Sequence, residues 1–251
     1  GLPSQLDTIS KIAKNNDLFI IEDACHAIGA EYKGKKIGSC TYSDIAVFSF
    51  HPVKHITTGE GGIITTNDDE LNSLLRVIRT HGITKDQSQF KTEHNEPWYQ
   101  EMQHLGFNYR LTDIQAALGI SQLSRIDQFV KRRREIAKQY DEFFEGLDHV
   151  DSISENHNEL HSYHLYVIKT KDSRTRLQLF EFLKQKGVLC QVHYIPIYWH
   201  PYYRETGFQN LSLQIAENFY SRIISIPMYP ALTDDEVQDV ISTISHFFND
   251  Q

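Results

Sequence analysis

Three side chains that could do cofactor chemistry follow two strand-like segments in the first half of the chain. Asp23 comes two residues after the end of the apolar run at 18–21, and Ser49 lies near the end of a second run at 45–50, with Lys54 five residues later. Ligands of open α/β sheets bind at the carboxyl ends of strands. A pyridoxal-phosphate enzyme needs a lysine that bonds to the cofactor, an aspartate for the ring nitrogen and a hydroxyl for the phosphate. The ordered set therefore predicts such a site.

Each of these residues also has a simpler explanation. Asp23 could equally be the N-cap of a helix, and a lone lysine in a loop is most often a surface charge. Lys54, however, lies between a buried-strand pattern and the glycine-rich turn at 59–62, among aromatic and β-branched residues. Desolvation in such a setting favours the neutral, nucleophilic form of an amine. The glycines allow close backbone approach.

Composition excludes several classes of protein. The 251 residues carry a net charge of −8, with 40% hydrophobic and 23% charged residues, which are ordinary globular values. The acidic balance disfavours nucleic-acid binding, and we expect the basic run at 131–134 to be a solvated helix face. No apolar run approaches the roughly 18–20 residues that a membrane helix needs. We therefore expect neither a nucleic-acid nor a membrane partner.

Cysteine and histidine usage predicts a reduced, cytoplasmic protein without a metal. The three cysteines form no CxxC motif and no paired framework. His51 and His55 are four residues apart, but Pro52 between them argues against one helix face, and the sequence has no HExxH motif. Cys25 beside His26 is not by itself a nucleophile–base pair. We expect no metal site.

In the first half, helix and strand patterns alternate, which predicts an α/β architecture. The residues at 67 and 70 form a capping-box pattern for a helix that we expect to bury Leu71, Leu74, Leu75 and Ile78. The expected elements are a helix at 3–15, strands at 18–21, 45–50 and 63–66, that helix from 67, and an unpatterned polar loop at 82–104.

One long helix is expected from a second capping box, Thr112 with Gln115, to about residue 143. After Gly146 the pattern changes to a smaller α+β unit. It comprises strands at 163–169 and 188–195 and helices at 174–185, 212–224 and 234–248, the last with a Thr233/Glu236 capping box. We place the division inside the long helix, which gives domains 1–125 and 126–251.

Five blocks, in order along the chain, resemble the DegT/DnrJ/StrS-type sugar aminotransferases. They are Ile-Glu-Asp-Ala-Cys-His-Ala-Ile-Gly-Ala at 21–30, Ser-Phe-His-Pro-Val-Lys at 49–54, Gly-Glu-Gly-Gly at 59–62, Arg-Thr-His-Gly at 79–82, and Gly-Phe-Asn-Tyr-Arg-Leu-Thr-Asp-Ile-Gln-Ala-Ala-Leu-Gly at 106–119. The resemblance implies the fold of the type I pyridoxal-phosphate transferases, with 1–125 as part of the large cofactor domain and 126–251 as the small α+β domain.

The resemblance also assigns roles by position. It implies that Lys54 bonds covalently to the cofactor, that Asp23 partners the ring nitrogen, and that Ser49 binds the phosphate beside the substrate. His26 stands where many relatives have a glutamine that contacts the phenolic oxygen. Asn108 is expected to reach the cofactor phosphate of a neighbouring subunit. The residue expected to lie near the sugar nucleotide in this shared homodimeric site is Arg110.

The second half resembles the subgroup of this family that makes the 4-amino precursor of pseudaminic acid. The stretch Gln-Val-His-Tyr at 191–194, followed by Tyr198, carries this resemblance together with Ser-Ile-Pro-Met at 225–228. It implies that Gln191, Val192, His193 and Tyr194 contact the UDP-sugar, with Tyr198 a weaker candidate. The alternative is that His193 and Tyr194 only pack against the sheet.

The resemblance implies a pyridoxal 5'-phosphate-dependent transfer of an amino group from L-glutamate to C4 of a UDP-linked 4-keto-6-deoxy-N-acetylhexose. The alternatives are another nucleotide-sugar aminotransferase, or a truncated or non-catalytic family member. Relatives are typically longer, and the chain begins with Gly1 just before the segment that carries Asp23. We therefore expect the first third of such an enzyme to be missing and the isolated chain to bind cofactor poorly, with open sheet edges.

Overall fold

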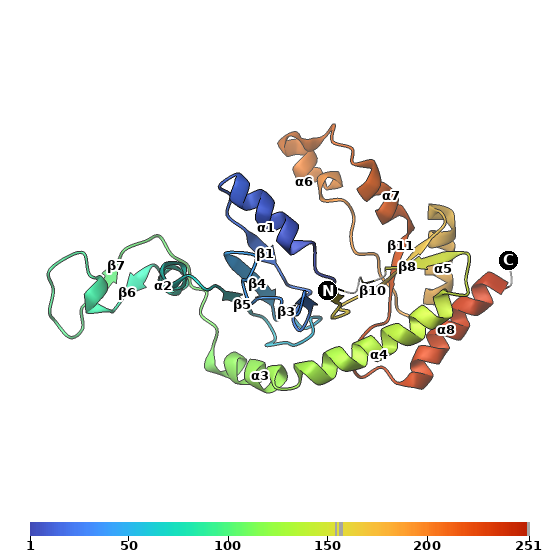
Figure 1. The fold of residues 1–251 in the computed structure, drawn as a ribbon, viewed down its shortest axis with the longest axis horizontal. Coiled ribbons are helices and arrows are strands. Elements are labelled where there is room, and N and C mark those ends of the chain that lie inside the picture. The colour runs from blue at the N-terminus through green and yellow to red at the C-terminus, as the bar shows by residue number, and fades with distance from the viewer. Residues whose placement is uncertain (154, 156–157, 250–251) are drawn as a thin grey trace. The chain divides into compact units, whose positions relative to one another are not determined.

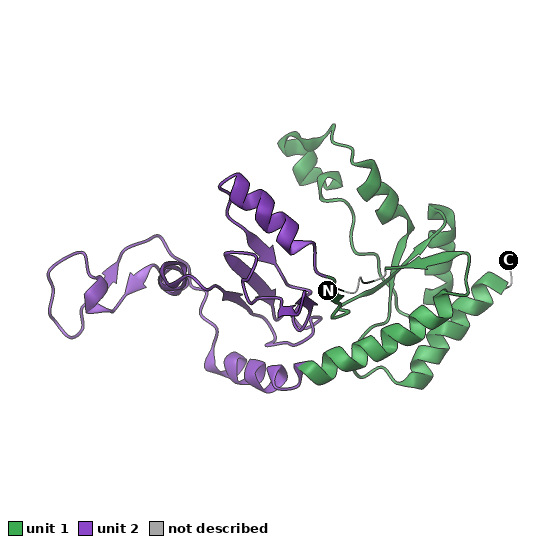
Figure 2. Ribbon diagram, in the orientation of Figure 1, with its two compact units in different colours: residues 1–2, 127–251 green, residues 3–126 purple. Residues whose placement is uncertain are grey.

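The computed structural model describes residues 1–153, 155 and 158–249. The chain divides into two compact units: unit 2 comprises residues 3–126, and unit 1 comprises residues 1–2 and 127–251 (Figure 2). The division falls at the start of the helix Ile126–Phe144 (Figure 1). Each unit is described below by itself.

Unit 2 is built around a three-stranded sheet in the order β1-β4-β5. β1 (Ile21–Asp23) runs parallel to β4 (Ile45–Ser49), and β5 (Gly62–Thr65) returns antiparallel to β4. The other elements of unit 2 are α1 (Leu6–Asn15), β2 (Glu31–Tyr32), β3 (Lys35–Lys36), α2 (Asp69–Ile78), β6 (Ile83–Thr84), the 3₁₀ turn η1 (Gln87–Gln89), β7 (Glu101–Met102) and α3 (Asp113–Leu123).

The first expected strand, at 18–21, was misplaced. The strand begins at Ile21 rather than residue 18, because the Ile20 N–H donates to the Asp44 side chain at 2.7 Å instead of entering a ladder. Ile21 is 62% exposed. Among the described residues, β1 is an edge strand of its sheet, since it pairs only with β4.

The expected capping box at the start of α2 was also wrong. The N-cap is Asp68, whose carboxylate accepts a hydrogen bond from the Leu71 N–H at 2.8 Å. Asn67 instead donates its side-chain amide to the Ser39 carbonyl at 2.8 Å. The helix has no fully buried residue, and Leu74 is 37% exposed. An apolar stripe of helical spacing marks the inner face but does not show that anything covers it.

The loop expected at 82–104 contains a small two-stranded element. β6 and β7 pair antiparallel, with Ile83 opposite Met102. The Glu101 carboxylate organises the connection, since it accepts hydrogen bonds from the Lys91 N–H at 2.6 Å and the Thr92 hydroxyl at 2.8 Å. These contacts join residues about ten positions apart, so no local sequence pattern predicts them.

The expected single long helix is two helices, α3 and α4 (Ile126–Phe144). The Thr112/Gln115 capping box at the start of α3 is confirmed by both reciprocal hydrogen bonds. α3 ends at Leu123, and the hydroxyl of its C-cap, Ser124, donates to the Ser121 carbonyl at 2.9 Å. Such local side-chain bonds compete with helix continuation.

Unit 1 packs helices against an antiparallel sheet in the order β11-β10-β8. Its core includes Leu179 and Leu183 of α5, Ile168 of β10 and Ile244 of α8, all with no exposed surface. No helix among the described residues is long and apolar enough to cross a membrane. The elements of unit 1 besides α4 are β8 (Val150–Ser152), β9 (Glu159–Leu160), β10 (Tyr166–Thr170), α5 (Ser173–Gln185), the 3₁₀ turn η2 (Ile197–Trp199), α6 (Pro201–Tyr203), η3 (Arg204–Phe208), α7 (Gln214–Arg222), β11 (Ile223–Ile226) and α8 (Asp234–Asn249).

Two expectations for this half were wrong. Residues 188–195 form no strand and contribute only one isolated bridge, Gln191 with Ser225. The helix expected at 212–224 ends at Arg222, and residues 223–226 form β11, which is buried along its whole length. A short, continuous apolar run fits a buried strand as well as a helix end, and pairing with β10 decides it.

The basic run at 131–134 is not a solvated helix face. Arg133 is only 3% exposed and donates from Nη1 to the carbonyls of Tyr163, His164 and Met228 at 2.9, 3.2 and 2.9 Å. Arg134 forms a bidentate pair with Glu155 at 2.7 and 2.9 Å. Arg133 and Arg134 of this run therefore make their polar contacts inside unit 1.

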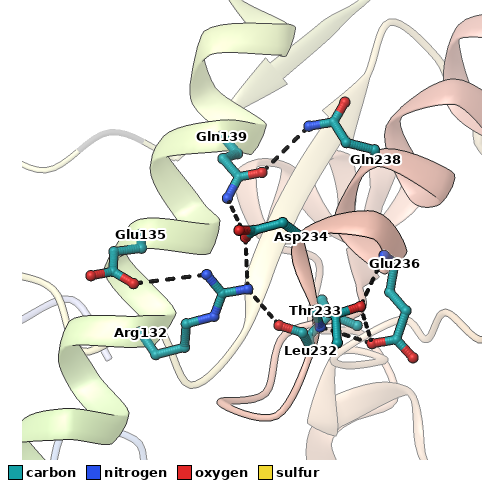
Figure 3. Close-up of polar contacts among 8 residues, drawn as sticks. All are labelled: Arg132, Glu135, Gln139, Leu232, Thr233, Asp234, Glu236 and Gln238. Carbon is teal, nitrogen blue, oxygen red and sulfur yellow. Dashed lines mark hydrogen bonds and ion pairs between the residues drawn. The ribbon is translucent and has the colours of Figure 1, made fainter.

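Figure 3 shows the neighbouring arginine joining α4 to the start of α8. Arg132 bonds the Leu232 carbonyl at 2.6 Å and pairs with Asp234 at 2.9 Å. The Thr233/Glu236 capping box beside it is confirmed, because the Glu236 N–H donates to the Thr233 hydroxyl and the Glu236 carboxylate accepts from the Thr233 N–H. These contacts fix where α8 begins.

Candidate active site

The two strands of unit 2 that precede the predicted site end side by side. Asp23, the last residue of β1, pairs in register with Val47 of β4. Ser49, two residues further along β4, is the last residue of that strand and lies opposite Gly62. Because β1 and β4 are parallel, their carboxyl ends meet at one edge of the sheet. The structure therefore brings the Asp23 and Ser49 positions together.

The Asp23 carboxylate is organised by the turn that follows it. Residues 24–30 form turns rather than a helix, so Asp23 is not a helix N-cap. Its Oδ1 accepts a hydrogen bond from the Cys25 N–H at 3.1 Å. The Cys25 thiol and N–H hold the pKa of Asp23 below its ordinary value, and the nearby charges of His26 and Lys54 act in the same direction. An exposed, ionised carboxylate is thus available at the strand end.

Lys54 lies in a loop whose two ends meet at Phe50, the residue that follows β4. The Phe50 N–H donates to the Gly61 carbonyl at 2.8 Å, and the Phe50 carbonyl accepts from the Thr58 N–H at 3.0 Å. Inside this closed loop the Lys54 N–H donates to the His51 carbonyl at 2.9 Å. Lys54 itself is half-buried. The loop holds the lysine next to the strand end and is not a free surface segment.

Two glycines allow the loop to close. A Cβ on Gly62 would lie 2.6 Å from the Phe48 carbonyl oxygen. Gly61 has φ +151°, and a Cβ there would lie 2.5 Å from the Thr58 hydroxyl. The helix α3 supports the same turn, because Gln115 donates from Nε2 to the Glu60 carbonyl at 2.9 Å. Sequence reasoning gave Gln115 only a capping role.

Ser49 and His26 complete the group at this edge. The Ser49 hydroxyl accepts a hydrogen bond from the His51 N–H at 3.3 Å, which directs it toward the turn. His26 is half-buried and follows Asp23 by three residues in the same turn segment. The four predicted cofactor residues of the strand ends therefore belong to one region of unit 2.

Asn108 and Arg110 follow the β6–β7 element on a separate segment of unit 2. Asn108 forms a bridge with Thr80, and both Asn108 and Arg110 are exposed. Just after them, Leu111 approaches the lysine loop, since a Cβ on Gly61 would lie 3.0 Å from Leu111 Cδ1. The exposed polar side chains of Asn108 and Arg110 therefore belong to the segment that adjoins the lysine loop.

The predicted substrate residues of the second half form their own cluster in unit 1. Gln191 and Ser225 exchange main-chain hydrogen bonds of 3.0 and 2.7 Å. His193 Nδ1 lies 2.8 Å from the Ser225 hydroxyl. The Gln191 side chain accepts from the Val192 N–H at 3.1 Å, and Tyr194 is 66% exposed. Ser225 therefore anchors the segment, a role that the sequence did not single out.

Tyr198 is the most enclosed of these candidates, at 9% exposed. Its hydroxyl donates to Glu217 at 2.9 Å and accepts from the Leu213 N–H at 3.3 Å. Burial, together with the Glu217 contact, raises the pKa of Tyr198. The hydroxyl thus joins η2 to the start of α7, and any substrate contact of Tyr198 stays a prediction.

Cys25 and Ser225 are the two supporting residues that sequence reasoning missed. Cys25 was considered only as a nucleophile, whereas the structure makes it a hydrogen-bond donor to Asp23. The Asp-x-Cys spacing could have predicted this contact, because an aspartate side chain commonly accepts a hydrogen bond from the main-chain N–H two residues later. Among the described residues no group of three or more His, Cys, Asp or Glu side chains could hold a metal ion.

Comparison with known families identifies the fold to which this geometry belongs. Residues 1–245 match the model of the DegT/DnrJ/EryC1/StrS aminotransferase family. The chain belongs to that family. Its fold is the type I fold of pyridoxal-phosphate enzymes, as in Helicobacter pylori PseC, an aminotransferase involved in the biosynthesis of pseudoaminic acid. That structure superposes with a TM-score of 0.90 at 33% identity, over 99% of this chain and 64% of that one.

Two further relatives support the family assignment. The UDP-4-amino-4,6-dideoxy-N-acetyl-beta-L-altrosamine transaminase of Campylobacter jejuni (serotype O:23/36) is 39% identical, over 97% of this chain and 62% of that one. A Streptococcus pneumoniae protein solved in a PLP form matches with a TM-score of 0.86 at 26% identity, over 99% of this chain and 66% of that one. The chain spans about 62 to 66% of the length of these relatives.

Proposed function

We propose that this protein transfers an amino group from L-glutamate to C4 of a UDP-linked 4-keto-6-deoxy-N-acetylhexose, using pyridoxal 5'-phosphate, in pseudaminic acid biosynthesis. The observation that carries the proposal is the group at the carboxyl edge of the unit 2 sheet, where Asp23 and Ser49 end neighbouring strands and Lys54 follows in a closed loop. The name of the Campylobacter relative supports the choice of sugar.

The residues present fit this cofactor. Asp23 carries an exposed carboxylate whose lowered pKa keeps it ionised, which suits a protonated ring nitrogen. Lys54 supplies a primary amine, and Ser49 a hydroxyl for a phosphate oxygen. When bound, the cofactor supplies an aldehyde that bonds to amines and a ring that accepts electrons from the neighbouring carbon.

The chain's own residues would then bind, orient and move protons. Asp23 keeps the ring nitrogen protonated through its negative charge, and His26 provides a polar contact for the phenolic oxygen. The Lys54 amine would give way to glutamate, and its Nζ would then carry the proton from the glutamate Cα to the cofactor. In the second half of the reaction the same Nζ would carry a proton from the cofactor to C4 of the sugar. One lysine thus serves both halves of the cycle.

Substrate contacts are proposed for each unit by itself. We assign the contacts to the UDP-sugar to the segment Gln191–Tyr194, whose conformation is set by the hydrogen bonds of Gln191 and His193 to Ser225. The guanidinium of Arg110 suits the diphosphate, since arginine binds phosphate oxygens in a bidentate manner. Tyr198 is a further candidate whose hydroxyl is already held by Glu217.

We infer that the protein acts as a homodimer in the cytoplasm. The exposed Asn108 and Arg110 support a site completed across two copies, because their side chains project from the segment beside the lysine loop. All three cysteines are free, which suits a reducing compartment. A sedimentation measurement of the protein gives its mass directly, and a monomer that turns over at the full rate would contradict the shared site.

The central test follows the cofactor's visible absorption in the purified protein. Because we expect this chain by itself to bind the cofactor poorly, pyridoxal phosphate is added in excess, and its bound-state absorption should then be bleached by L-glutamate and restored by the UDP-linked 4-keto-sugar. Lys54→Ala should lose the covalently bound state and reduce turnover by at least about 10⁴-fold, because it removes both the nucleophile and the proton carrier. The matched control is Lys85→Ala, which removes an exposed lysine of the same unit.

The other outcomes separate the alternatives. Bleaching by glutamate followed by restoration only with a differently linked keto-sugar would identify another nucleotide-sugar aminotransferase. Cofactor binding without any response to glutamate would indicate a non-catalytic family member. Unchanged turnover in Lys54→Ala would overturn the proposed role of the lysine altogether.

A further inference from the structure

The first turns of α3 lie against the end of the lysine loop, which comprises residues 50–61. Gln115 donates from Nε2 to the Glu60 carbonyl at 2.9 Å. One turn further along α3, a Cβ on Gly119 would lie only 3.0 Å from Thr58 Cγ2. Residues four apart lie on the same face of a helix. One face of α3 therefore contacts the lysine loop at two successive turns.

The Glu60 carbonyl accepts a second hydrogen bond, from inside the loop. The donor is the hydroxyl of Thr58, at 2.7 Å. Thr58 is 3% exposed, and its N–H donates to the Phe50 carbonyl at 3.0 Å. The contact with Gln115 therefore continues through Thr58 to Phe50, four residues before Lys54.

The side-chain amide of Gln115 uses both of its ends. Its Oε1 accepts hydrogen bonds from the N–H and the hydroxyl of Thr112, both at 3.0 Å, while its Nε2 donates to Glu60. A glutamate could accept the same two bonds and is equally usual in a capping box, but an ionised carboxylate has no hydrogen to donate. The helix cap therefore accounts for the acceptor at position 115, and the lysine loop accounts for the donor.

We propose that Gln115 is a positioning residue for Lys54: its amide fixes the Glu60 end of the lysine loop against α3, and thereby fixes where the loop holds the lysine amine. The inference rests on the proposed function for its purpose, which is to hold that amine at the carboxyl edge of the sheet. Gln115 acts through the loop. It also joins the loop to the segment that carries Asn108 and Arg110, shortly before α3.

Two variants separate the helix cap from the loop contact. Gln115→Glu keeps an acceptor for Thr112 but loses the donor to Glu60, whereas Thr112→Val removes the cap hydroxyl and leaves the Gln115 amide in place. Amide hydrogen exchange is measured at Phe50 and Thr58, whose N–H groups close the loop. In Gln115→Glu both should exchange roughly three- to tenfold faster, as for the loss of one hydrogen bond, while the first turn of α3 is unchanged. Thr112→Val should show the reverse pattern.

A second measurement reports on the lysine itself. Reductive ¹³C-methylation gives each lysine amine an NMR signal, and the signal of the half-buried Lys54 should shift in Gln115→Glu toward that of the exposed Lys85. In Thr112→Val it should stay in place. An unshifted Lys54 signal in Gln115→Glu, an equal shift in both variants, or unchanged exchange at Phe50 and Thr58 would overturn the proposal. Neither measurement needs the cofactor, so a protein that shows both changes but transfers no amino group would contradict the proposed function alone.

Discussion

Unit 1 and unit 2 are each stabilised in a different way. Unit 1 contains a continuous cluster of buried apolar side chains, in which Ile168, Leu179 and Ile244 have no exposed surface. The predicted cofactor residues lie instead in unit 2, where hydrogen-bonded turns and close glycine contacts shape the lysine loop. Packing therefore stabilises unit 1, whereas backbone geometry defines the site in unit 2.

The apolar surface of unit 2 makes the contrast sharper. Ile21 of β1 is 62% exposed, and Leu18 and Phe19 before it are 60% and 55% exposed. In α3, Ile114 is 84% and Ile120 72% exposed. Unit 2 consequently gains much less from burial than unit 1, and substitutions in the two units should differ in cost.

The largest effect is expected in the core of unit 1. Leu179→Ala should lower the free energy of unfolding by about 2–5 kcal/mol, because it removes fully buried methyl groups and leaves a cavity. Ile120→Ala, on the exposed face of α3, should change it by less than about 0.5 kcal/mol. Urea unfolding together with amide exchange of β10 and β4 reports each unit separately. Comparable losses for the two variants would refute the contrast.

A smaller effect is expected at the closure of the lysine loop. Gly62→Ala should cost about 1–3 kcal/mol, since its Cβ would lie 2.6 Å from the Phe48 carbonyl oxygen between paired strands. Gly59→Ala is the matched variant, with φ +83° but no atom within 4 Å of the Cβ, and should cost only about 1 kcal/mol. Exchange of the β4 and β5 amides measures both. A milder effect at Gly62 than at Gly59 would show that the strands tolerate the approach.

The smallest expected effect is a loss of folding stability at acidic pH. Burial lowers the pKa of His161 from 6.5 to about 3, so the folded state binds this proton less readily than the unfolded chain. The stability due to neutral His161 is therefore complete above pH 6.5 and is lost as pH falls below it, by about 1 kcal/mol at pH 5.5. His161→Asn keeps an acceptor for the Tyr163 N–H, which donates to His161 Nδ1 at 2.8 Å, and should flatten the profile.

The control for the acid experiment is His200→Asn, at an exposed position of the same unit. It should reproduce the pH dependence of the unmodified protein in thermal or urea unfolding between pH 5 and 7. A steep profile that persists in His161→Asn would assign the acid sensitivity to other groups.

Local features of the fold could be predicted from the sequence. The capping boxes at Thr112/Gln115 and Thr233/Glu236 were confirmed, because their partners are three residues apart and the pattern contains the whole interaction. Asp23 and Ser49 were placed at strand ends for a similar reason. The site was expected at the carboxyl ends of the two strands, and these ends lie together because β1 and β4 run parallel.

What could not be predicted depends on contacts between distant residues. The stretch 188–195 has strand composition, but only Gln191 finds a strand partner. The stripe on α2 was expected to be buried, yet the described chain leaves it half-covered. Asparagine is a favourable N-cap residue, but the side chain of Asn67 instead donates a hydrogen bond to the Ser39 carbonyl. Spacing along the chain shows which face is apolar, and only the fold shows what covers it.

Arg133 has a consequence for how this chain tolerates change. Burial lowers the pKa of Arg133 to about 10, and three main-chain carbonyls, not a carboxylate, receive its donors. The turn at 163–164 and the residue Met228, distant in sequence, therefore depend on the same guanidinium. Substitutions that turn one carbonyl away should not be additive with changes at the other. The arginine therefore couples the conformations of two segments that are distant in the sequence.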